Sequence, residues 1–209
     1  MSSDLILYHI APSRSSIVHW MLEEVGEPYD LRVLDMEKGE NRQPDFLKIN
    51  PMGKVPTLVH DGVVITEAAA ICAYLADAYP RAGLSVPIGD RRRGPYLKWL
   101  FFGPGTLEPA LVDVMLKREA GPVPALGYGS LDMVVDVLAQ AVEPGPYLLG
   151  PQFTAADVVL GATIHWGSST GALSQHPALT AYASRIAERP AFQRAWKRDE
   201  EIAAARQTG

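Results

Sequence analysis

The segment from Asn50 to Ala68 constrains the fold of this chain more than any other. It contains a proline-bearing loop, a short apolar run, the pair Asp61-Gly62, a second apolar run and a small-residue helix start. Asp-Gly between two apolar runs is a strong signal for a β-hairpin with a two-residue turn. The segment therefore predicts a loop, a strand, a tight turn, a strand and a helix, in that order.

The same segment carries backbone groups suited to a small acidic peptide. A proline just before a strand needs a positional reason. If the Val55–Pro56 bond is cis, which costs little before proline, the N–H and C=O of Val55 face outward and can pair with an extended peptide. Glu67 and Ala68 begin the next helix, whose free N–H groups can hold a carboxylate. A backbone clamp beside a carboxylate cradle predicts a small acidic peptide as the ligand.

Apolar periodicity extends this segment into a mixed α/β domain. The expected elements are a strand at 5–10, a helix closed by Gly26, a strand at 29–33, a helix at 44–49, strands at 57–60 and 63–65, and a helix at 68–79. The resulting order, β-α-β-α-β-β-α, is that of a thioredoxin-like domain. We therefore predict an α+β chain whose first domain covers residues 1–80.

The rest of the chain shows helical spacing and no strand pattern. Small and turn residues at 81–89 predict a linker, followed by an all-α helical bundle at 90–209. Helices are expected near 90–118, 128–143, 154–167, 177–189 and 190–204. Thr154 and Asp157 have the spacing of a capping box, a structural device at a helix start.

Composition excludes several functional classes. The net charge of −5 gives no electrostatic support to nucleic-acid binding. No apolar run approaches the ~20 residues of a membrane span, and the N-terminus lacks the pattern of a signal peptide. Cys72 is the only cysteine, so no intrachain disulfide can form. That usage fits a reducing, cytoplasmic compartment.

Three segments together resemble the glutathione S-transferase family: 50–67, 153–157 and 177–192. The resemblance spans nearly the whole chain and is closest to bacterial, theta- or beta-like members of the serine type. It implies that the thioredoxin-like domain binds glutathione and that a wall of the helical domain binds a hydrophobic cosubstrate. It also implies a homodimer and a role in detoxification.

Glutathione transfer requires a thiolate near neutral pH. A free thiol has a pKa near ~8.5, so only a few per cent of it is ionised at pH 7. A hydroxyl that donates a hydrogen bond to the sulfur favours the anion, and a helix N-terminus adds to the effect. Ser13 lies between the first strand and the first helix. Aligned on Gly26, it matches the catalytic serine of theta-like and delta-like members.

Two other hydroxyls compete with Ser13 for this role. Ser15 is its neighbour, and Tyr8 falls where tyrosine-type members carry their catalytic residue. An aromatic residue at that position also suits the core of a strand. Arg14 stands in place of the cysteine of beta-type and omega-like members, which disfavours chemistry through a protein thiol. His9 is assigned no role, because a lone histidine is more often structural.

The expected glutathione contacts are Lys54, Val55, Pro56, Glu67 and Ala68. Lys54 is either a partner for the glycyl carboxylate or a solvated loop lysine. Ala68 departs from the family, in which a serine hydroxyl there helps to hold the γ-glutamyl carboxylate. The loss of one hydrogen bond to a charged group costs ~1.5–3 kcal/mol, so glutathione is expected to bind weakly or the ligand to differ.

Aromatic and apolar side chains of the helical domain are candidates for the cosubstrate pocket. They are Tyr96, Trp99, Leu100, Phe102, Met115 and Trp166. The Gly103-Pro104-Gly105 sequence should kink or break the first helix of this domain, and an aromatic wall beside a break suits an apolar pocket. For about half of these residues, the core of the bundle is the better explanation. No spacing typical of a metal site is present.

We therefore predict a glutathione S-transferase that activates the thiol of glutathione for attack on a hydrophobic electrophile. Two alternatives stay open. Ala68, which lacks the family's serine hydroxyl, supports the alternative of a noncatalytic protein with the same fold that binds apolar ligands or a protein partner. The same thiolate could also serve a glutathione-dependent peroxidase or isomerase.

Overall fold

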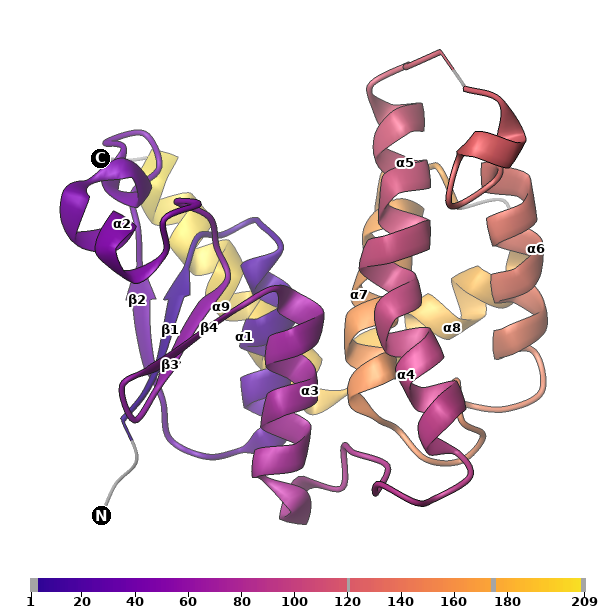
Figure 1. Ribbon diagram of the computed structural model, residues 1–209, viewed down its shortest axis with the longest axis horizontal. Coiled ribbons are helices and arrows are strands. Elements are labelled where there is room, and N and C mark those ends of the chain that lie inside the picture. Colours follow the sequence, from indigo (N-terminus) through magenta and orange to yellow (C-terminus); the bar gives the residue numbers. More distant parts are fainter. Residues whose placement is uncertain (1–3, 120, 174–175, 208–209) are drawn as a thin grey trace. The chain divides into compact units, whose positions relative to one another are not determined.

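The computed structural model describes residues 4–119, 121–173 and 176–207 (Figure 1). These residues form two compact units. The first unit comprises the described residues up to Ala82 together with those from Pro190 onward, and the second is Gly83–Arg189. The first unit is thus built from both ends of the chain, whereas the sequence pattern assigned everything from 90 to 209 to one helical domain.

The first unit contains a four-stranded sheet in the order β2-β1-β3-β4. Its strands are β1 (Leu5–His9), β2 (Asp30–Val33), β3 (Thr57–His60) and β4 (Val63–Thr66). β1 and β2 are parallel, and the other two pairs are antiparallel. The predicted strands and the thioredoxin-like order are confirmed.

Helices α1 (Ser15–Val25) and α3 (Ala68–Ala78) pack against each other and against β1 and β4. The short helix α2 (Pro44–Ile49) has the predicted bounds, and short 3₁₀ turns lie at Glu40–Arg42 and Pro80–Ala82. Gly26 ends α1 with φ 77°, a left-handed conformation that suits glycine. The apolar face of α1 is fully buried at Val18, Met21 and Leu22.

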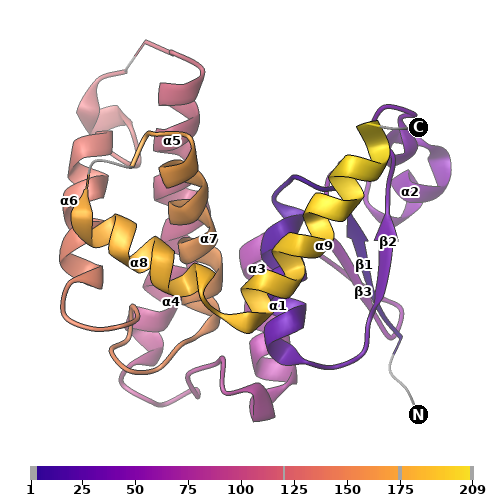
Figure 2. The same cartoon turned by 180° about the vertical axis from the view of Figure 1, so that it is seen from behind.

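The last helix, α9 (Pro190–Gln207), packs along α1 (Figure 2). Phe192 meets the ring of Trp20 edge to face at 5.0 Å, and it stacks on Trp196 at 5.0 Å. The guanidinium of Arg194 donates a 2.7 Å hydrogen bond to the Glu23 carboxylate of α1. Residues from the end of the chain therefore complete the core of the sheet unit.

The second unit consists of helices, as predicted. They are α4 (Arg93–Phe102), α5 (Glu108–Met115), α6 (Leu131–Val142), α7 (Ala155–Ser169) and α8 (Pro177–Ala187), with a 3₁₀ turn at Val123–Ala125. The helix expected over 90–118 is divided by a π-helical turn at Gly103–Leu107. Pro104 within this turn has no N–H to donate, so regular α-helical bonding cannot pass through it.

The predicted capping box at the start of α7 is confirmed. The buried Asp157 carboxylate accepts hydrogen bonds from the N–H and hydroxyl of Thr154 at 2.9 and 3.0 Å. It also accepts from the Leu148 N–H at 2.8 Å and from the Tyr182 hydroxyl at 2.9 Å. Asp157 thereby joins α7, α8 and the preceding loop inside the helical unit. Nowhere in the described ranges does a helix combine the length and hydropathy that a membrane span requires.

Candidate active site

The strand register gathers four loops at one edge of the sheet. Parallel pairing sets the end of β1 beside the end of β2, because His9 pairs with Val33. Antiparallel pairing sets Tyr8 of β1 opposite Thr57, the first residue of β3. Thr57 in turn pairs with Thr66, the last residue of β4. The segments after β1, after β2, before β3 and after β4 therefore meet at the same edge.

The loop before β3 is held from beneath by a buried amide. Asn50 is 4% exposed, and its Nδ2 donates to the Lys54 carbonyl at 2.9 Å and to the Thr57 hydroxyl at 3.0 Å. Its Oδ1 accepts the Met52 N–H at 3.1 Å. Gly53, at φ 60°, lies where an added Cβ would stand 2.7 Å from a backbone carbonyl oxygen. Only glycine fits this turn without displacing its neighbours.

This anchored loop carries Val55 and Pro56, the residues predicted to pair with a peptide ligand. The Val55–Pro56 bond is cis, as is Ala11–Pro12. Pro56 is buried and Val55 half-buried, whereas Lys54 is exposed. Within the described residues, neither the N–H nor the C=O of Val55 has a hydrogen-bond partner. Both groups are therefore available to an extended ligand.

The segment after β4 has an unusual backbone at Glu67. Its φ of 67° and ψ of 114° lie outside the regions that residues with a Cβ readily occupy. Such a conformation costs of order 1–3 kcal/mol and is concentrated at functional sites. Glu67 is exposed and directly precedes α3, and Ala68 is half-buried at its first position. The start of α3 therefore offers a carboxylate and free N–H groups at the same sheet edge as Val55.

The three candidate hydroxyls have different surroundings. Ser13 is half-buried, and its Oγ accepts the Ser15 N–H at 3.1 Å. Ser15 is fully buried, and its Oγ accepts the Ile10 N–H at 3.1 Å. Tyr8 is 9% exposed; its ring contacts Phe46 at 5.3 Å and its hydroxyl accepts from Arg32 at 3.3 Å. Of the three, Ser13 has the greatest access to a ligand.

Behind Ser13 lies a connected series of polar side chains. The Oγ atoms of Ser13 and Ser15 are 2.7 Å apart, and Ser15 Oγ lies 2.8 Å from His9 Nδ1. His9 Nε2 lies 3.1 Å from Oδ1 of Asp199 on α9, a contact at ion-pair distance without the alignment of a regular hydrogen bond. Nδ1 of His19 on α1 lies 2.6 Å from the same carboxylate oxygen. All of these residues belong to the sheet unit.

Asp199 stays anionic in this setting. Burial alone would raise the pKa of its carboxyl group, but the hydrogen bond from His19 and the close approach of His9 hold that pKa well below its usual range. The 2.6 Å separation between His19 Nδ1 and Asp199 Oδ1 is that of a direct hydrogen bond. Since a carboxylate only accepts, His19 is the donor of the 2.6 Å hydrogen bond.

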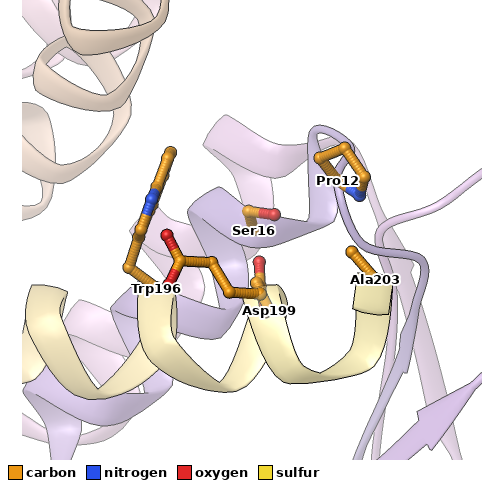
Figure 3. Close-up of a pocket in the computed structure, with 6 residues that line it drawn as sticks. Pro12, Ser16, Trp196, Asp199 and Ala203 are labelled. Atoms are coloured by element: carbon orange, nitrogen blue, oxygen red, sulfur yellow. The ribbon is translucent and has the colours of Figure 1, made fainter. Parts of the chain in front are cut away.

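A small hollow of about 180 Å³ opens beside this cluster, between α1 and α9. Figure 3 shows Asp199 rising from α9 toward Ser16 of α1, with Pro12, Trp196 and Ala203 around them. At the far end of α9, Arg206 donates to the carbonyls of Ala11 at 3.0 Å and of Leu34. The last helix therefore reaches the loops after β1 and β2 that form part of the site.

Sequence reasoning assigned no role to His9 and overlooked Asp199. One signal was available for Asp199, because it continues the spacing of Phe192, Ala195 and Trp196 along one face of α9. A carboxylate at an inward position of a helix needs a buried partner. Cys72 is buried, which raises the pKa of its thiol. Its burial agrees with the core position expected from helical spacing.

The predicted cosubstrate residues all lie in the helical unit. Tyr96, Trp99 and Leu100 are buried in α4 as part of the core of that unit. Phe102 is half-buried against Trp99, with ring centroids 5.3 Å apart. Trp166 is half-buried, and Met115 is 48% exposed. The structure thus divides this set between core and accessible positions.

Comparison with known proteins matches both units. A family model described as the N-terminal domain of glutathione S-transferase matches residues 3–77, and one described as the C-terminal domain matches 125–185. Glutathione S-transferase GstA of Escherichia coli O157:H7 is 28% identical over 178 residues, which cover 84% of this chain and 89% of that protein.

Solved structures give the same result over almost the full length. A glutathione transferase from Methylococcus capsulatus is 32% identical, with a TM-score of 0.79 over 94% of this chain and 98% of the other. A sphingomonad glutathione S-transferase complexed with glutathione is 30% identical, with a TM-score of 0.79 over 93% and 98%.

Proposed function

The chain belongs to the glutathione S-transferase family, and from this premise we propose that it binds glutathione along the sheet edge formed by Val55, Glu67 and Ser13. It is a transferase, and its cosubstrate is a hydrophobic electrophile. The main support for this binding site is the register of the four strands, which brings these loops together. Relatives of similar fold have been solved with glutathione bound.

The peptide backbone of glutathione pairs with the N–H and C=O of Val55, which have no partner among the described residues. Its γ-glutamyl end lies at the start of α3, where Glu67 pairs with the ammonium group and backbone N–H groups hold the carboxylate. The exposed Lys54 pairs with the glycyl carboxylate, and Pro56 shapes the loop. Each charged group of glutathione is thereby paired with a side chain of the opposite charge or with the N-terminus of a helix.

The thiol lies at Ser13, whose hydroxyl donates a hydrogen bond to the sulfur. Ser13 is favoured over Ser15 and Tyr8 because it is the most accessible of the three. The buried Ser15 hydroxyl is engaged by His9 and by the backbone of Ile10. This assignment makes the protein a serine-type member of the family. Thiolate activation and proximity supply the catalysis.

The electrophile binds against accessible residues of the helical unit, namely Phe102, Met115 and Trp166. The π-helical turn at Gly103–Leu107 gives this proposal support, because such turns often occur at functional sites. The active form is a homodimer in the cytoplasm, a compartment that fits a chain with one buried thiol. Size-exclusion chromatography with light scattering tests the dimer.

A noncatalytic binding protein is the second candidate, because Ala68 offers no hydroxyl for the γ-glutamyl carboxylate. Calorimetric titration with glutathione, with thiolate absorbance followed on the same samples, separates the two. Binding accompanied by ultraviolet absorbance of a thiolate near neutral pH supports the enzyme. Absence of binding at millimolar glutathione would favour the noncatalytic protein. Peroxidase and isomerase activities are then assayed with the same thiolate.

Turnover with an activated aryl halide tests the role of Ser13. We expect Ser13→Ala to lower kcat by about 10- to 100-fold, the effect of losing one hydrogen bond to an anion. The Kd for glutathione should change little, because its charged ends are held elsewhere. Tyr8→Phe is the matched control and should retain turnover, since the Tyr8 hydroxyl meets Arg32. Unchanged turnover in Ser13→Ala would transfer the role to Tyr8 or Ser15.

A further inference from the structure

We propose that His9 is the base that receives the thiol proton of glutathione, through the hydroxyls of Ser15 and Ser13. The inference rests on the proposed function, because it takes the thiol to lie at Ser13. The separations along this relay are 2.7 Å between the two serine Oγ atoms and 2.8 Å from Ser15 Oγ to His9 Nδ1. Both distances are those of hydrogen bonds.

Asp199 sets the proton positions in the relay. Its carboxylate oxygen lies 3.1 Å from His9 Nε2, and this negative charge favours the imidazole tautomer with its proton on Nε2 and its lone pair on Nδ1. Ser15 then donates its O–H to His9 Nδ1, and Ser13 donates its O–H to Ser15 Oγ. The Ile10 carbonyl, 3.1 Å from Ser15 Oγ, is a competing acceptor, but it is farther away and less basic than the imidazole.

Proton transfer leaves both serines unchanged. The S–H bond of glutathione breaks and its proton passes to Ser13 Oγ, while the Ser13 proton passes to Ser15 Oγ and the Ser15 proton to His9 Nδ1. Each serine loses one O–H bond and forms another. The products are a thiolate, which accepts a hydrogen bond from Ser13, and an imidazolium between Ser15 and the Asp199 carboxylate. After the conjugate forms, His9 returns the proton along the same hydroxyls to the leaving group or to water.

The surroundings of His9 favour this product state. His9 is 0% exposed, and an isolated imidazolium there would lack solvation. Asp199 supplies the compensating charge, and His19 orients that carboxylate from the other side at 2.6 Å. The elements packed around His9 carry further charged or titratable groups. They are Tyr8 on β1, Glu23 and Glu24 on α1, Tyr29 before β2, Asp30 and Arg32 on β2, His60 on β3, and Arg194, Lys197, Arg198, Glu200, Glu201 and Arg206 on α9. His9 is thus the base nearest to the serines, with its counter-ion already in place.

Proton counting separates this relay from a structural role. Glutathione is titrated into the protein near neutral pH in buffers of different ionisation enthalpy, which gives the protons released on binding. Thiolate absorbance on the same samples gives the thiolate formed. S-methylglutathione, which has no thiol proton, gives the background to subtract. We expect the wild-type protein to release much less than one proton per thiolate, because the proton stays on His9.

Two variants interrupt the relay at different points, and a third is the matched control. His9→Asn keeps a polar group near Nδ1 but cannot hold the proton, and Ser15→Ala removes the middle hydroxyl. In either variant, each thiolate that forms should release one proton, and kcat/KM should fall about 10²-fold, as for loss of a general base. If one variant fails to fold, the other decides. His60→Asn is that control: His60 lies on β3 of the same unit, and its ring contacts Tyr74 and Tyr79 and, in the described part of the chain, no serine, so its proton count should match the wild-type value.

One full proton per thiolate in the wild-type protein would overturn the relay while leaving the thiolate itself intact. An unchanged proton count in both His9→Asn and Ser15→Ala would overturn it as well. Failure of the proposed function has a different signature, since glutathione would then give neither binding heat nor thiolate absorbance.

Discussion

Removal of the Asn50 side chain should loosen the loop that carries the peptide clamp. In Asn50→Ala, the carbonyl of Lys54, the hydroxyl of Thr57 and the N–H of Met52 each lose a partner. A typical hydrogen bond contributes about 0.5–1.5 kcal/mol net, and a buried group left unsatisfied costs more. Three such losses at a residue that is 4% exposed predict a decrease of about 3 kcal/mol in the free energy of unfolding.

The functional effect should appear in glutathione binding rather than in chemistry. The loop presents Val55, and the fraction of molecules with a competent loop scales the apparent affinity. KM for glutathione should therefore rise, while kcat at saturating glutathione stays close to the wild-type value. Unfolding in urea at one fixed protein concentration measures the stability, and calorimetry measures the Kd.

Asn41→Ala provides the comparison for Asn50→Ala. Asn41 Nδ2 makes one hydrogen bond to the same loop, to the Gly53 carbonyl at 2.9 Å, so its loss should cost about 1 kcal/mol. If Asn50→Ala were no less stable than Asn41→Ala and bound glutathione like the wild type, the anchoring role given to Asn50 would be refuted.

Three further predictions concern both units. Tyr182→Phe removes one donor from the Asp157 carboxylate and should lower the unfolding free energy by about 1.5–3 kcal/mol, measured in urea; no change would contradict this. Gly53→Ala should lose more stability than Gly39→Ala, because both have positive φ but only Gly53 meets a backbone oxygen at 2.7 Å; equal losses would refute the clash. The pKa of Asp199 is depressed, so its stabilising contribution is complete above the ordinary carboxyl pKa and is lost as pH falls below it. Asp199→Asn should therefore flatten the decline in stability from pH 6 to 3, and parallel curves would argue against the linkage.

Local sequence signals sufficed for most elements of the fold. The hairpin turn, the left-handed Gly26 and the capping box at Thr154 each depend on residues close together in the chain. The division of the long helix at Pro104 was predictable from one missing N–H. The π-helical form of that break was not, because it depends on how the flanking helices pack.

The interior of the site could not be predicted from local pattern. Asp199 and His19 are 180 positions apart in the sequence. Helical periodicity predicts which face of α9 is buried but not which element packs against that face. Ser13 and Ser15 look alike in sequence. In the folded chain, Ser15 is buried and bonded to the backbone of Ile10, whereas Ser13 is accessible.

The sheet unit draws on both ends of the chain, and this sets an order of assembly during synthesis. Chains emerge from the ribosome N-terminus first, so strands, loops and both serines are made well before α9. The helical unit, Gly83–Arg189, emerges complete while the carboxylate at 199 is still missing. A chain truncated before α9 would keep the glutathione-binding loops but lack Asp199, the counter-ion for His9, and Arg206, which ties the loops after β1 and β2. If Asp199 and His9 act as proposed, thiol activation depends on α9, and products of synthesis that end before this helix should lack this chemistry.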